Sequence, residues 1–251
     1  MTASKIEWTE YSWNPVTGCT KVSPGCANCY AERFAERLKA MGVKRYARGF
    51  EVCLHRDLVT LPLRWRKPRV VFVNSMSDLF HEDVPAGFIA DVFATMNRCP
   101  QHTFQVLTKR SNRVLALSPQ LKWTHNIWMG VSVENGEAAG RISDLVKTDA
   151  RVKFLSCEPL LGPLDEIALT GIDWVIVGGE SGPNARPIRK EWVISIRDQC
   201  VASDIPYFFK QWGGTNKKAA GRLLEGTIWD QRPPLAHETL CLAEALSTAD
   251  A

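Results

Sequence analysis

Three of the eight cysteines in this 251-residue chain lie close together near its N-terminus. Cys19, Cys26 and Cys29 occupy a polar stretch bent by glycine and proline, whereas the other five cysteines are scattered singly. Thiolates bind soft metals, and a bent loop can direct three of them to one point. A polar loop is also a poor place to bury three thiols as hydrophobic residues. The spacing therefore predicts a metal centre formed by these three cysteines.

Two kinds of metal centre are compatible with three cysteines in one loop. A structural zinc ion usually takes four ligands, commonly in two close pairs, whereas a [4Fe–4S] cluster held by three cysteines leaves one iron open to a substrate or cofactor. Zinc would need a fourth ligand from Cys53, His55 or His81, and the sequence contains no second paired motif. The spacing alone leaves both centres open.

The composition is that of an ordinary folded globular protein. With 45% hydrophobic and 23% charged residues, it excludes wholesale disorder, collagen-like repeats and a coiled coil. No apolar run approaches the roughly 18 residues that a membrane span needs, and the first residues resemble no export signal. We therefore expect a cytoplasmic protein without a membrane partner. The formal net charge of +4 permits an anionic partner without requiring one.

Short apolar runs alternate with amphipathic segments after residue 50. Each run is too short for a helix and too uniformly apolar for a strand with one solvated face, so each predicts a strand covered on both faces. Amphipathic stripes at residues 88–96 and 192–200 predict helices between strands. The predicted strands are residues 70–73, 103–107, 127–131, 152–155, 174–177 and 207–209, with weaker candidates at 13–16 and 51–54.

This alternation predicts an α/β fold, a partial or complete (β/α) barrel of parallel strands, with a flat doubly wound sheet as the alternative. One domain is expected over residues 1–232, with the metal-binding loop at residues 18–30 and a C-terminal tail at 233–251. The tail contains alanine and leucine and is compatible with a terminal helix.

Polar side chains follow each predicted strand. In a barrel or an open parallel sheet the carboxyl ends of the strands form the ligand-binding face, so these side chains should converge there. Helix capping explains the serines and the aspartate equally well, but it explains the charged side chains less well. The candidate site residues are Ser75, Ser77, Asp78, Lys109, Ser132, Glu134, Glu158, Glu180 and Lys210.

Several blocks of sequence together resemble the phage-associated three-cysteine-motif family, over roughly residues 6–233. The blocks are residues 13–19, 25–31, 74–80, 107–110, 130–134, 156–160 and 177–182. That family is similar to radical S-adenosylmethionine (SAM) enzymes, and spore photoproduct lyases are the nearest of these in character. The resemblance implies a radical-SAM-like barrel, a [4Fe–4S] cluster on Cys19, Cys26 and Cys29, and SAM on the open iron.

The cysteine motif departs from the usual radical SAM pattern. Six residues separate Cys19 from Cys26 instead of three, and Asn28 stands where an aromatic residue usually precedes the last cysteine. The Gly-Gly-Glu element that usually holds the SAM amino group near the second strand has no counterpart there. A glycine-rich loop can absorb the extra residues, because only the three sulfur positions are fixed.

The resemblance implies an enzyme in which a one-electron donor drives cleavage of SAM to methionine and a 5′-deoxyadenosyl radical. That radical would act on a nucleic-acid or nucleotide substrate in repair or modification. Position on the predicted ligand-binding face makes Ser75, Ser77, Asp78, Lys109, Ser132 and Glu134 the candidates for contacts to SAM. It leaves Glu158, Glu180 and Lys210 as the candidates for catalysis at the substrate. The basic run around Trp65, residues 63–69, suits phosphates and stacked bases, or equally a solvated face.

Two alternatives stay open. One is a non-catalytic zinc or iron–sulfur module that binds nucleic acid through Arg64 to Arg69. The other is a barrel hydrolase or lyase that uses Glu158 and Glu180 as acid and base, with structural cysteines. The sequence alone fixes neither the substrate, nor the electron donor, nor the oligomeric state.

Overall fold

The computed structural model describes residues 2–4 and 6–239. Its main sheet contains seven parallel strands in the order in which they occur along the chain, flanked by a short antiparallel strand, β1 (Thr2–Ala3). The parallel strands are β2 (Tyr11–Trp13), β5 (Val70–Val73), β6 (Thr103–Thr108), β7 (Ile127–Ser132), β8 (Val152–Cys157), β9 (Trp174–Gly178) and β10 (Tyr207–Gln211).

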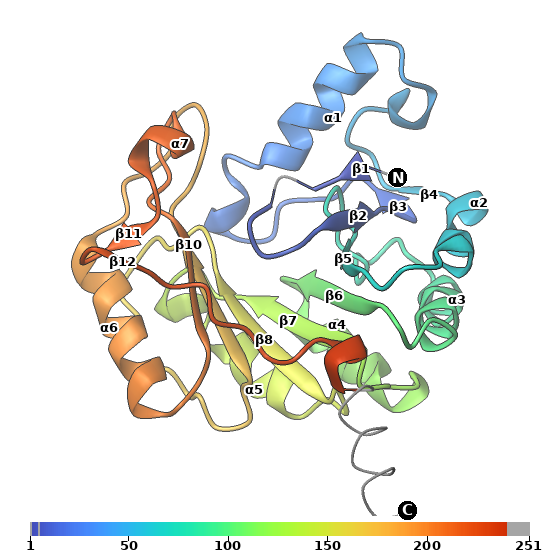
Figure 1. Cartoon of the computed structure of the whole chain (residues 1–251). Helices are drawn as coiled ribbons and strands as arrows, with labels where there is room; N and C mark the ends of the chain where they lie inside the picture. The colour runs from blue at the N-terminus through green and yellow to red at the C-terminus, as the bar shows by residue number, and fades with distance from the viewer. Residues whose placement is uncertain (1, 5, 240–251) are drawn as a thin grey trace, which may run out of the picture.

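The order of the strands distinguishes the two predicted architectures. A doubly wound sheet reverses direction at a switch point, whereas each strand here pairs with the next parallel strand of the sequence. The sheet curves without closing, with β1 and β10 at its edges, so the fold is a half-barrel (Figure 1). The predicted α/β fold with a partial (β/α) barrel is confirmed, and the flat sheet is excluded.

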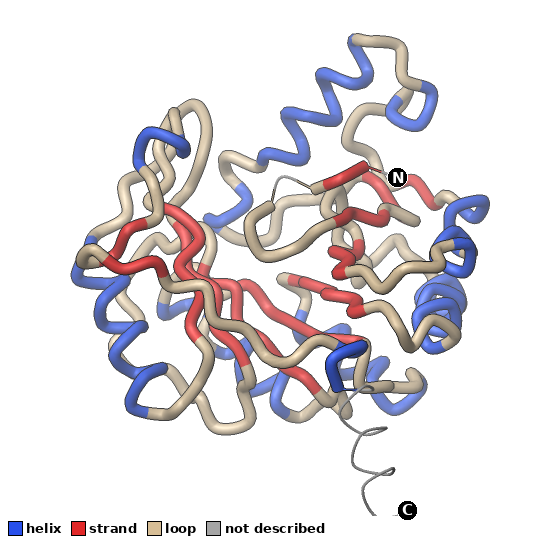
Figure 2. The backbone as a smooth tube through the Cα atoms, in the orientation of Figure 1, coloured by secondary structure: helices blue, strands red, loops and turns tan. Residues whose placement is uncertain are grey.

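Helices cover the convex face of the sheet (Figure 2). Four of them follow strands: α3 (Ala86–Asn97), α4 (Ser111–Leu117), α5 (Gly140–Val146) and α6 (Lys190–Ala202). The remaining helices are α1 (Tyr30–Ala40), α2 (Arg56–Val59) and α7 (Lys217–Ala220), with 3-10 turns at Pro24–Cys26, Lys44–Tyr46, Leu61–Arg64, Ser118–Gln120 and Gly136–Ala138. Two small sheets pair β3 (Val16–Thr17) with β4 (Cys53–Leu54) and β11 (Leu223–Leu224) with β12 (Thr227–Ile228).

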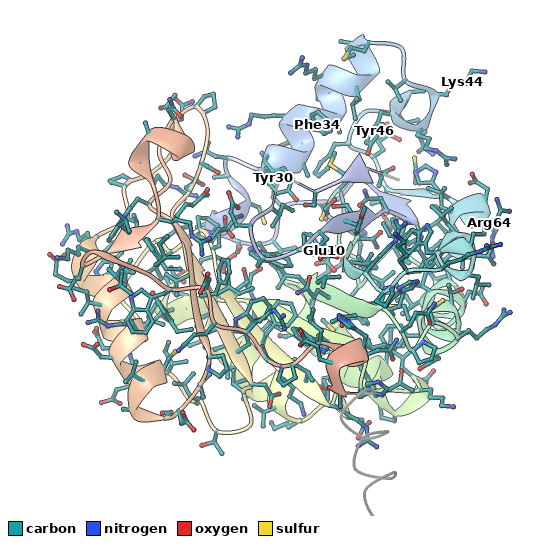
Figure 3. All side chains as sticks on the ribbon, in the orientation of Figure 1. Glu10, Tyr30, Phe34, Lys44, Tyr46 and Arg64 are labelled. Carbon is teal, nitrogen blue, oxygen red and sulfur yellow. The ribbon has the colours of Figure 1, made fainter. Side chains whose placement is uncertain are left out.

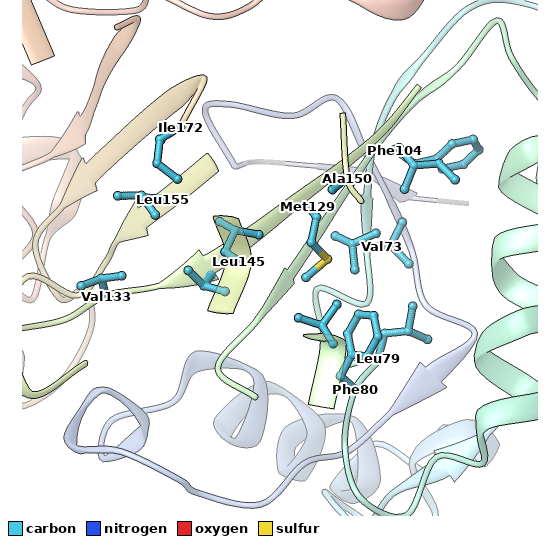
Figure 4. Packing of buried hydrophobic residues seen from close by; sticks show 14 of the residues in the cluster. Val73, Leu79, Phe80, Phe104, Met129, Val133, Leu145, Ala150, Leu155 and Ile172 are labelled. Atoms are coloured by element: carbon cyan, nitrogen blue, oxygen red, sulfur yellow. The ribbon is translucent and has the colours of Figure 1, made fainter. Parts of the chain in front are cut away.

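The larger hydrophobic core lies between the convex face and its helices (Figure 4). Alternate strand residues such as Val73, Met129 and Leu155 point outward and pack against helix residues such as Leu145. The amphipathic stripes predicted at residues 88–96 and 192–200 supply their buried side chains to this core. The helices are therefore held mainly by apolar burial, at about 25 cal/mol for each Å² of apolar surface.

A second core fills the amino-terminal part of the barrel interior, and aromatic rings dominate it. Ring centroids lie between 4.8 and 6.4 Å apart in this group. The six residues, here called the aromatic floor, are Trp8, Phe72, Trp128, Phe154, Trp174 and Phe208. Side chains alternate along a strand. The residues two and four positions after each floor residue of a strand therefore face the same interior, nearer the carboxyl ends of the strands.

All six strongly predicted strands are present, each within two residues of its predicted end. The weaker candidates form short strands instead: β2 joins the main sheet, while β3 and β4 pair with each other. Leu235, at the start of the predicted tail, packs against the aromatic floor. Residues 236–239 of that tail are helical, and residues 240–251 lie outside the described residues. Over the described part of the chain, no helix is long and apolar enough to cross a membrane.

Candidate active site

The three clustered cysteines belong to a loop, residues 18–30, that lies over the carboxyl ends of the strands. This loop is called the cysteine loop, and those strand ends are called the mouth. Gly18 begins the loop: its N–H donates to the Met76 carbonyl (3.0 Å) and its carbonyl accepts from Ser77 Oγ (2.5 Å). Its φ is +84°, and an added Cβ would lie 2.0 Å from the Glu51 carbonyl oxygen. Only glycine fits this position, so the turn at Gly18 sets the position of Cys19.

Glu134, after β7, anchors the middle of the cysteine loop. Its side chain is 2% exposed and accepts hydrogen bonds from Ser23 Oγ (2.7 Å), Lys109 Nζ (2.6 Å) and Arg141 (2.7 Å). Burial alone would raise the pKa of this carboxyl, but Lys109, Ser23 and Arg141 outweigh burial and hold the pKa below its ordinary 4.5. An added Cβ at Gly25 would lie 2.4 Å from the Glu134 carboxylate, so the loop backbone rests directly on it.

Glu180, after β9, anchors the far end of the same loop. Its carboxylate accepts from Asn28 Nδ2 (2.9 Å) and forms a two-pronged pair with Arg186, whose Nη2 also donates to the Pro24 carbonyl (2.9 Å). Burial opposes ionisation, but the bonds from Arg186 and Asn28 lower the pKa of Glu180 to about 2. Glu180 is therefore a permanent anion at neutral pH, and in this structure it holds the loop.

The loop thiols differ from the cysteines of the core. Cys19, Cys26 and Cys29 are partly exposed, whereas Cys99, Cys157 and Cys200 are buried. Nearby donors face two of the loop sulfurs: Arg110 Nη1 lies 3.6 Å from Cys19 Sγ, and Ser23 Oγ lies 3.8 Å from Cys26 Sγ. Cys29 occupies the N-cap position of α1, and its side chain makes no capping hydrogen bond.

Without a metal, the Cys19 thiol is protonated at neutral pH. Burial and the Asp78 carboxylate raise its pKa to about 11, and Arg110 opposes this only in part. A metal ligand must be a thiolate, so binding at Cys19 releases a proton. Among the described residues, no three His, Cys, Asp or Glu side chains are close enough to hold a single metal ion.

Two of the three proposed fourth zinc ligands, His55 and His81, have other partners. His81 Nε2 bonds to Thr20 Oγ1 (2.8 Å), and His81 Nδ1 accepts from the Asp83 N–H (3.1 Å). His55 Nε2 bonds to Thr17 Oγ1 (2.9 Å). The donor set of the loop itself is therefore three thiols. It fits an iron–sulfur cluster, in which each thiolate binds a different iron and the sulfurs stay apart.

Asp78, predicted to contact SAM, is the centre of a buried network. Its carboxylate accepts from Thr108 Oγ1 (2.7 Å), the Lys109 N–H (3.2 Å), the Phe80 N–H (2.9 Å) and Arg110 Nη1 (3.1 Å). Arg110 continues to the loop, since it also donates to Thr20. The network links the ends of β5 and β6 to the cysteine loop and leaves Asp78 6% exposed.

A second ion pair at the mouth does not hold the loop. Lys210 Nζ, on β10, lies 2.6 Å from Glu158 Oε1, after β8, and the two side chains are 11% and 18% exposed. By strand alternation, Ser132, Ser156 and Gly178 line the interior between this pair and the aromatic floor. The side chains above the floor are therefore small, and Lys210 and Glu158 lie beyond them at the rim.

Sequence comparison assigns the chain to a family. Residues 3–233 match the profile described as "Protein of unknown function (DUF5131)". The chain belongs to this family. A search of curated proteins gives no match.

One solved structure shows similarity to this DUF5131 chain, "Spore photoproduct lyase complexed with dinucleoside spore photoproduct". The TM-score is 0.47 and the sequence identity is 11%, over 79% of this chain and 62% of that one. The chain thus spans less than two thirds of the length of that structure.

The structure brings the predicted site residues to one end of the half-barrel, in two groups. Ser77, Asp78, Lys109, Glu134 and Glu180 contact the cysteine loop directly or through one partner. Glu158 and Lys210 pair with each other, Ser132 lines the interior, and Ser75 Oγ donates to Asn14 (3.2 Å). Helix capping does not explain these polar residues, since no side chain caps α1 to α6.

Sequence reasoning missed four residues at this site: Asn28, Tyr30, Arg110 and Arg186. Tyr30 follows the last cysteine directly, and its hydroxyl donates to the Ser75 carbonyl. Arg110 adjoins the predicted Lys109, so its position at the end of β6 was a usable signal. Arg186 had none, because it lies in an irregular segment after β9.

The basic run around Trp65 lies at the opposite end of the sheet. It ends at Arg69, directly before the first residue of β5. Trp65 is only 7% exposed, and it packs against His102 (5.6 Å between ring centroids) and the Arg69 guanidinium (5.2 Å). Its ring is thus not available to stack on a base.

Proposed function

We propose that this protein is a radical SAM-type enzyme that carries a [4Fe–4S] cluster on Cys19, Cys26 and Cys29. One observation supports the proposal most directly. Three partly exposed thiols, with no histidine among them, stand on a loop anchored over the ligand-binding end of an open parallel half-barrel. The resemblance of the sequence blocks to the three-cysteine-motif family supports the same assignment.

When bound, the cluster supplies the electron that cleaves SAM to methionine and a 5′-deoxyadenosyl radical. The residues of this chain have three tasks around that reaction. Gly18, Glu134 and Glu180 hold the cysteine loop at a fixed height over the mouth. Fixed positions matter because hydrogen abstraction needs the reacting atoms within about 3–3.5 Å.

The second task is to bind SAM, whose amino and carboxylate groups are charged. Lys210 and Glu158 offer one positive and one negative group at the rim. Ser132 adds a hydroxyl on the same interior face, and this hydroxyl would hydrogen-bond to the ribose or the methionine group of SAM. Ser75, Ser77, Asp78, Lys109 and Glu134 act on SAM indirectly, by fixing the loop and the strand ends.

The third task is to exclude water from the radical. The aromatic floor closes the interior from below, because Trp128, Phe154 and Trp174 are each at most 1% exposed. With this end closed, water would reach the interior only through the mouth. We assign Glu158 and Lys210 to the rim, where they contact both SAM and the substrate, and Glu180 to positioning of the loop. The substrate class that we propose is a nucleic acid or a nucleotide.

The test is formation of 5′-deoxyadenosine. Protein reconstituted anaerobically with iron and sulfide would be reduced, supplied with SAM and assayed by liquid chromatography and mass spectrometry. We expect 5′-deoxyadenosine from the native chain and none from Cys19→Ala. Glu137→Gln, an exposed change close to Glu134 in sequence, is the matched control and should retain the activity. A fully iron-loaded native protein that makes no 5′-deoxyadenosine would contradict the proposal.

A further inference from the structure

Helix α1 rises from the cysteine loop and is packed on one side only. Its buried residues are Ala31 and Ala35, which join a small cluster with Met76. Two aromatic rings one turn apart remain in solvent, with Tyr30 50% and Phe34 48% exposed. Figure 3 shows both on the part of the molecule that projects away from the sheet. The two rings therefore form an exposed surface about one helical turn long.

The segment that carries these rings is strongly basic. Residues 30–48, here called the α1 projection, contain six Lys or Arg and two Glu, a net charge equal to the +4 of the whole chain. Arg45 and Arg48 are neutralised by Asp57 and Glu51. The ion pairs seen in the described part of the chain do not include Arg37, Lys39 or Lys44, all of which are exposed.

The α1 projection is continuous with the mouth. The Tyr30 hydroxyl donates to the Ser75 carbonyl after β5, and Arg33 donates to the Ser181 (3.2 Å) and Pro183 (3.3 Å) carbonyls after β9. The first turn of α1 therefore spans the mouth from one side of the sheet to the other. Tyr30 stands at its rim, and Phe34 and the free cations lie progressively further out.

We propose that the α1 projection binds single-stranded nucleic acid, with bases stacked on Tyr30 and Phe34 and phosphates held by Arg37, Lys39 and Lys44. Aromatic rings accept any base, and adjacent cations neutralise the backbone, which is how proteins hold single strands. The surface ends at the mouth, so one nucleotide of a bound strand reaches Lys210 and Glu158. This location for the substrate rests on the proposed function, but the binding itself does not.

An acidic protein or an anionic bilayer would also be attracted to this charge. The flat, half-exposed rings beside a mouth favour nucleobases, which stack on both faces. The basic run of residues 63–69 gives an internal comparison of equal charge. Its tryptophan is buried and it lies at the other end of the sheet, so it lacks both features.

The experiment measures the affinity for a fluorescent 20-nucleotide single-stranded DNA of mixed sequence by anisotropy, between 50 and 200 mM salt. Arg37→Ala/Lys39→Ala/Lys44→Ala should lower the slope of log affinity against log salt by about 2, at roughly 0.7 for each lost phosphate contact. Phe34→Ala should weaken binding by about 5-fold to 100-fold with little change in slope. Thermal unfolding would verify that each variant is folded.

The matched control is Arg64→Ala/Arg66→Ala/Lys67→Ala, which removes the same charge from exposed positions of the other basic run. We expect it to bind DNA as the native chain does. Equal loss in both triple variants, or no binding to the native chain at 50 mM salt, would overturn the proposal. Binding to phosphatidylglycerol vesicles that depends on the α1 projection, without binding to DNA, would overturn it too. The assay needs neither cluster nor SAM, so Cys19→Ala/Cys26→Ala/Cys29→Ala should still bind, whatever becomes of the proposed enzyme.

Discussion

The two ends of the barrel interior are made of opposite kinds of residue. The amino-terminal end is the aromatic floor, where rings such as Trp128 and Trp174 are 1% exposed and pack edge to face. The carboxyl-terminal end has small side chains in the interior and, among the described residues, five ion pairs around it. They join Asp78, Glu134, Glu158 and Glu180 to lysine or arginine. The floor contributes stability, and the mouth positions chemical groups.

The mouth is itself divided. Glu134 and Glu180 are tied to the cysteine loop, whereas Glu158 and Lys210 bond only to each other among the contacts described. Glutamates at equivalent strand ends thus have different tasks, because the neighbouring segments place different hydrogen-bond donors beside them. The predictions below test this division, beginning with the floor.

The largest effect on stability is expected at the floor. Trp174→Ala removes a ring that contacts four other rings of the aromatic floor, so the free energy of unfolding should fall by about 3–5 kcal/mol. Lys210→Ala at the rim leaves the mostly buried Glu158 carboxylate without its partner, so it should cost about 1–3 kcal/mol. It should also reduce 5′-deoxyadenosine formation at least about 10-fold. Denaturant unfolding and the SAM cleavage assay measure the two effects. A rim variant as unstable as the floor variant would refute the contrast.

A smaller loss is expected when the loop anchor is changed. Glu134→Gln keeps the shape but removes the charge that pairs with Lys109 and Arg141, so stability should fall by about 1–3 kcal/mol. Because Ser23 also loses its anionic acceptor, the iron bound per chain after reconstitution should fall as well. Glu137→Gln is the control for both measurements. Full iron occupancy in Glu134→Gln would show that the anchor does not position the cysteines.

The close approach of the loop to Glu134 gives a steric test of the same anchor. Gly25→Ala places a Cβ within 2.4 Å of the carboxylate, so the loop must shift, at a cost of about 1–3 kcal/mol. Gly87→Ala in α3 is the matched control, since an added Cβ there meets nothing within 4 Å. The control should be neutral or slightly stabilising. Iron occupancy that falls equally in both variants would argue against a specific contact.

The smallest effect is a change in how stability depends on pH. Glu180 stays charged in the folded chain down to about pH 2 and in the unfolded chain only above about 4.5, so the unfolded chain binds more protons between these values. The stabilisation from this carboxylate is complete above pH 4.5 and is lost as the pH falls towards 2. Unfolding of Glu180→Gln at several pH values should show a shallower loss of stability across this range. Parallel curves for the two proteins would contradict the assignment.

Much of the fold follows from local sequence. The apolar runs of β5 to β10 are buried on both faces of the sheet. Such a run can be recognised in the sequence as a buried strand. The curvature of the sheet carries no comparable signal. The choice between barrel and flat sheet was settled by strand order, which depends on pairing between distant segments.

The location of the site could be predicted from the sequence, but the roles of its residues could not. Polar residues at strand ends converge because parallel strands end together, which any sequence with this pattern predicts. The partners of these residues were not predictable. Glu180 pairs with Arg186, which lies in an irregular segment, and Glu134 accepts from Ser23, which is more than 100 residues away in sequence. Side-chain pairing across such distances depends on how loops pack, and the same holds for Trp65, whose burial no local pattern reveals.

The most direct test of the central assignment is the metal content of the anaerobically reconstituted protein, with electron paramagnetic resonance of its reduced form before and after SAM is added. The account predicts about four irons per chain and a spectrum that SAM changes. Cys19→Ala/Cys26→Ala/Cys29→Ala should lose the iron, and Cys53→Ala should keep it. Stoichiometric zinc that Cys53→Ala removes, or a cluster whose spectrum SAM leaves unchanged, would contradict it.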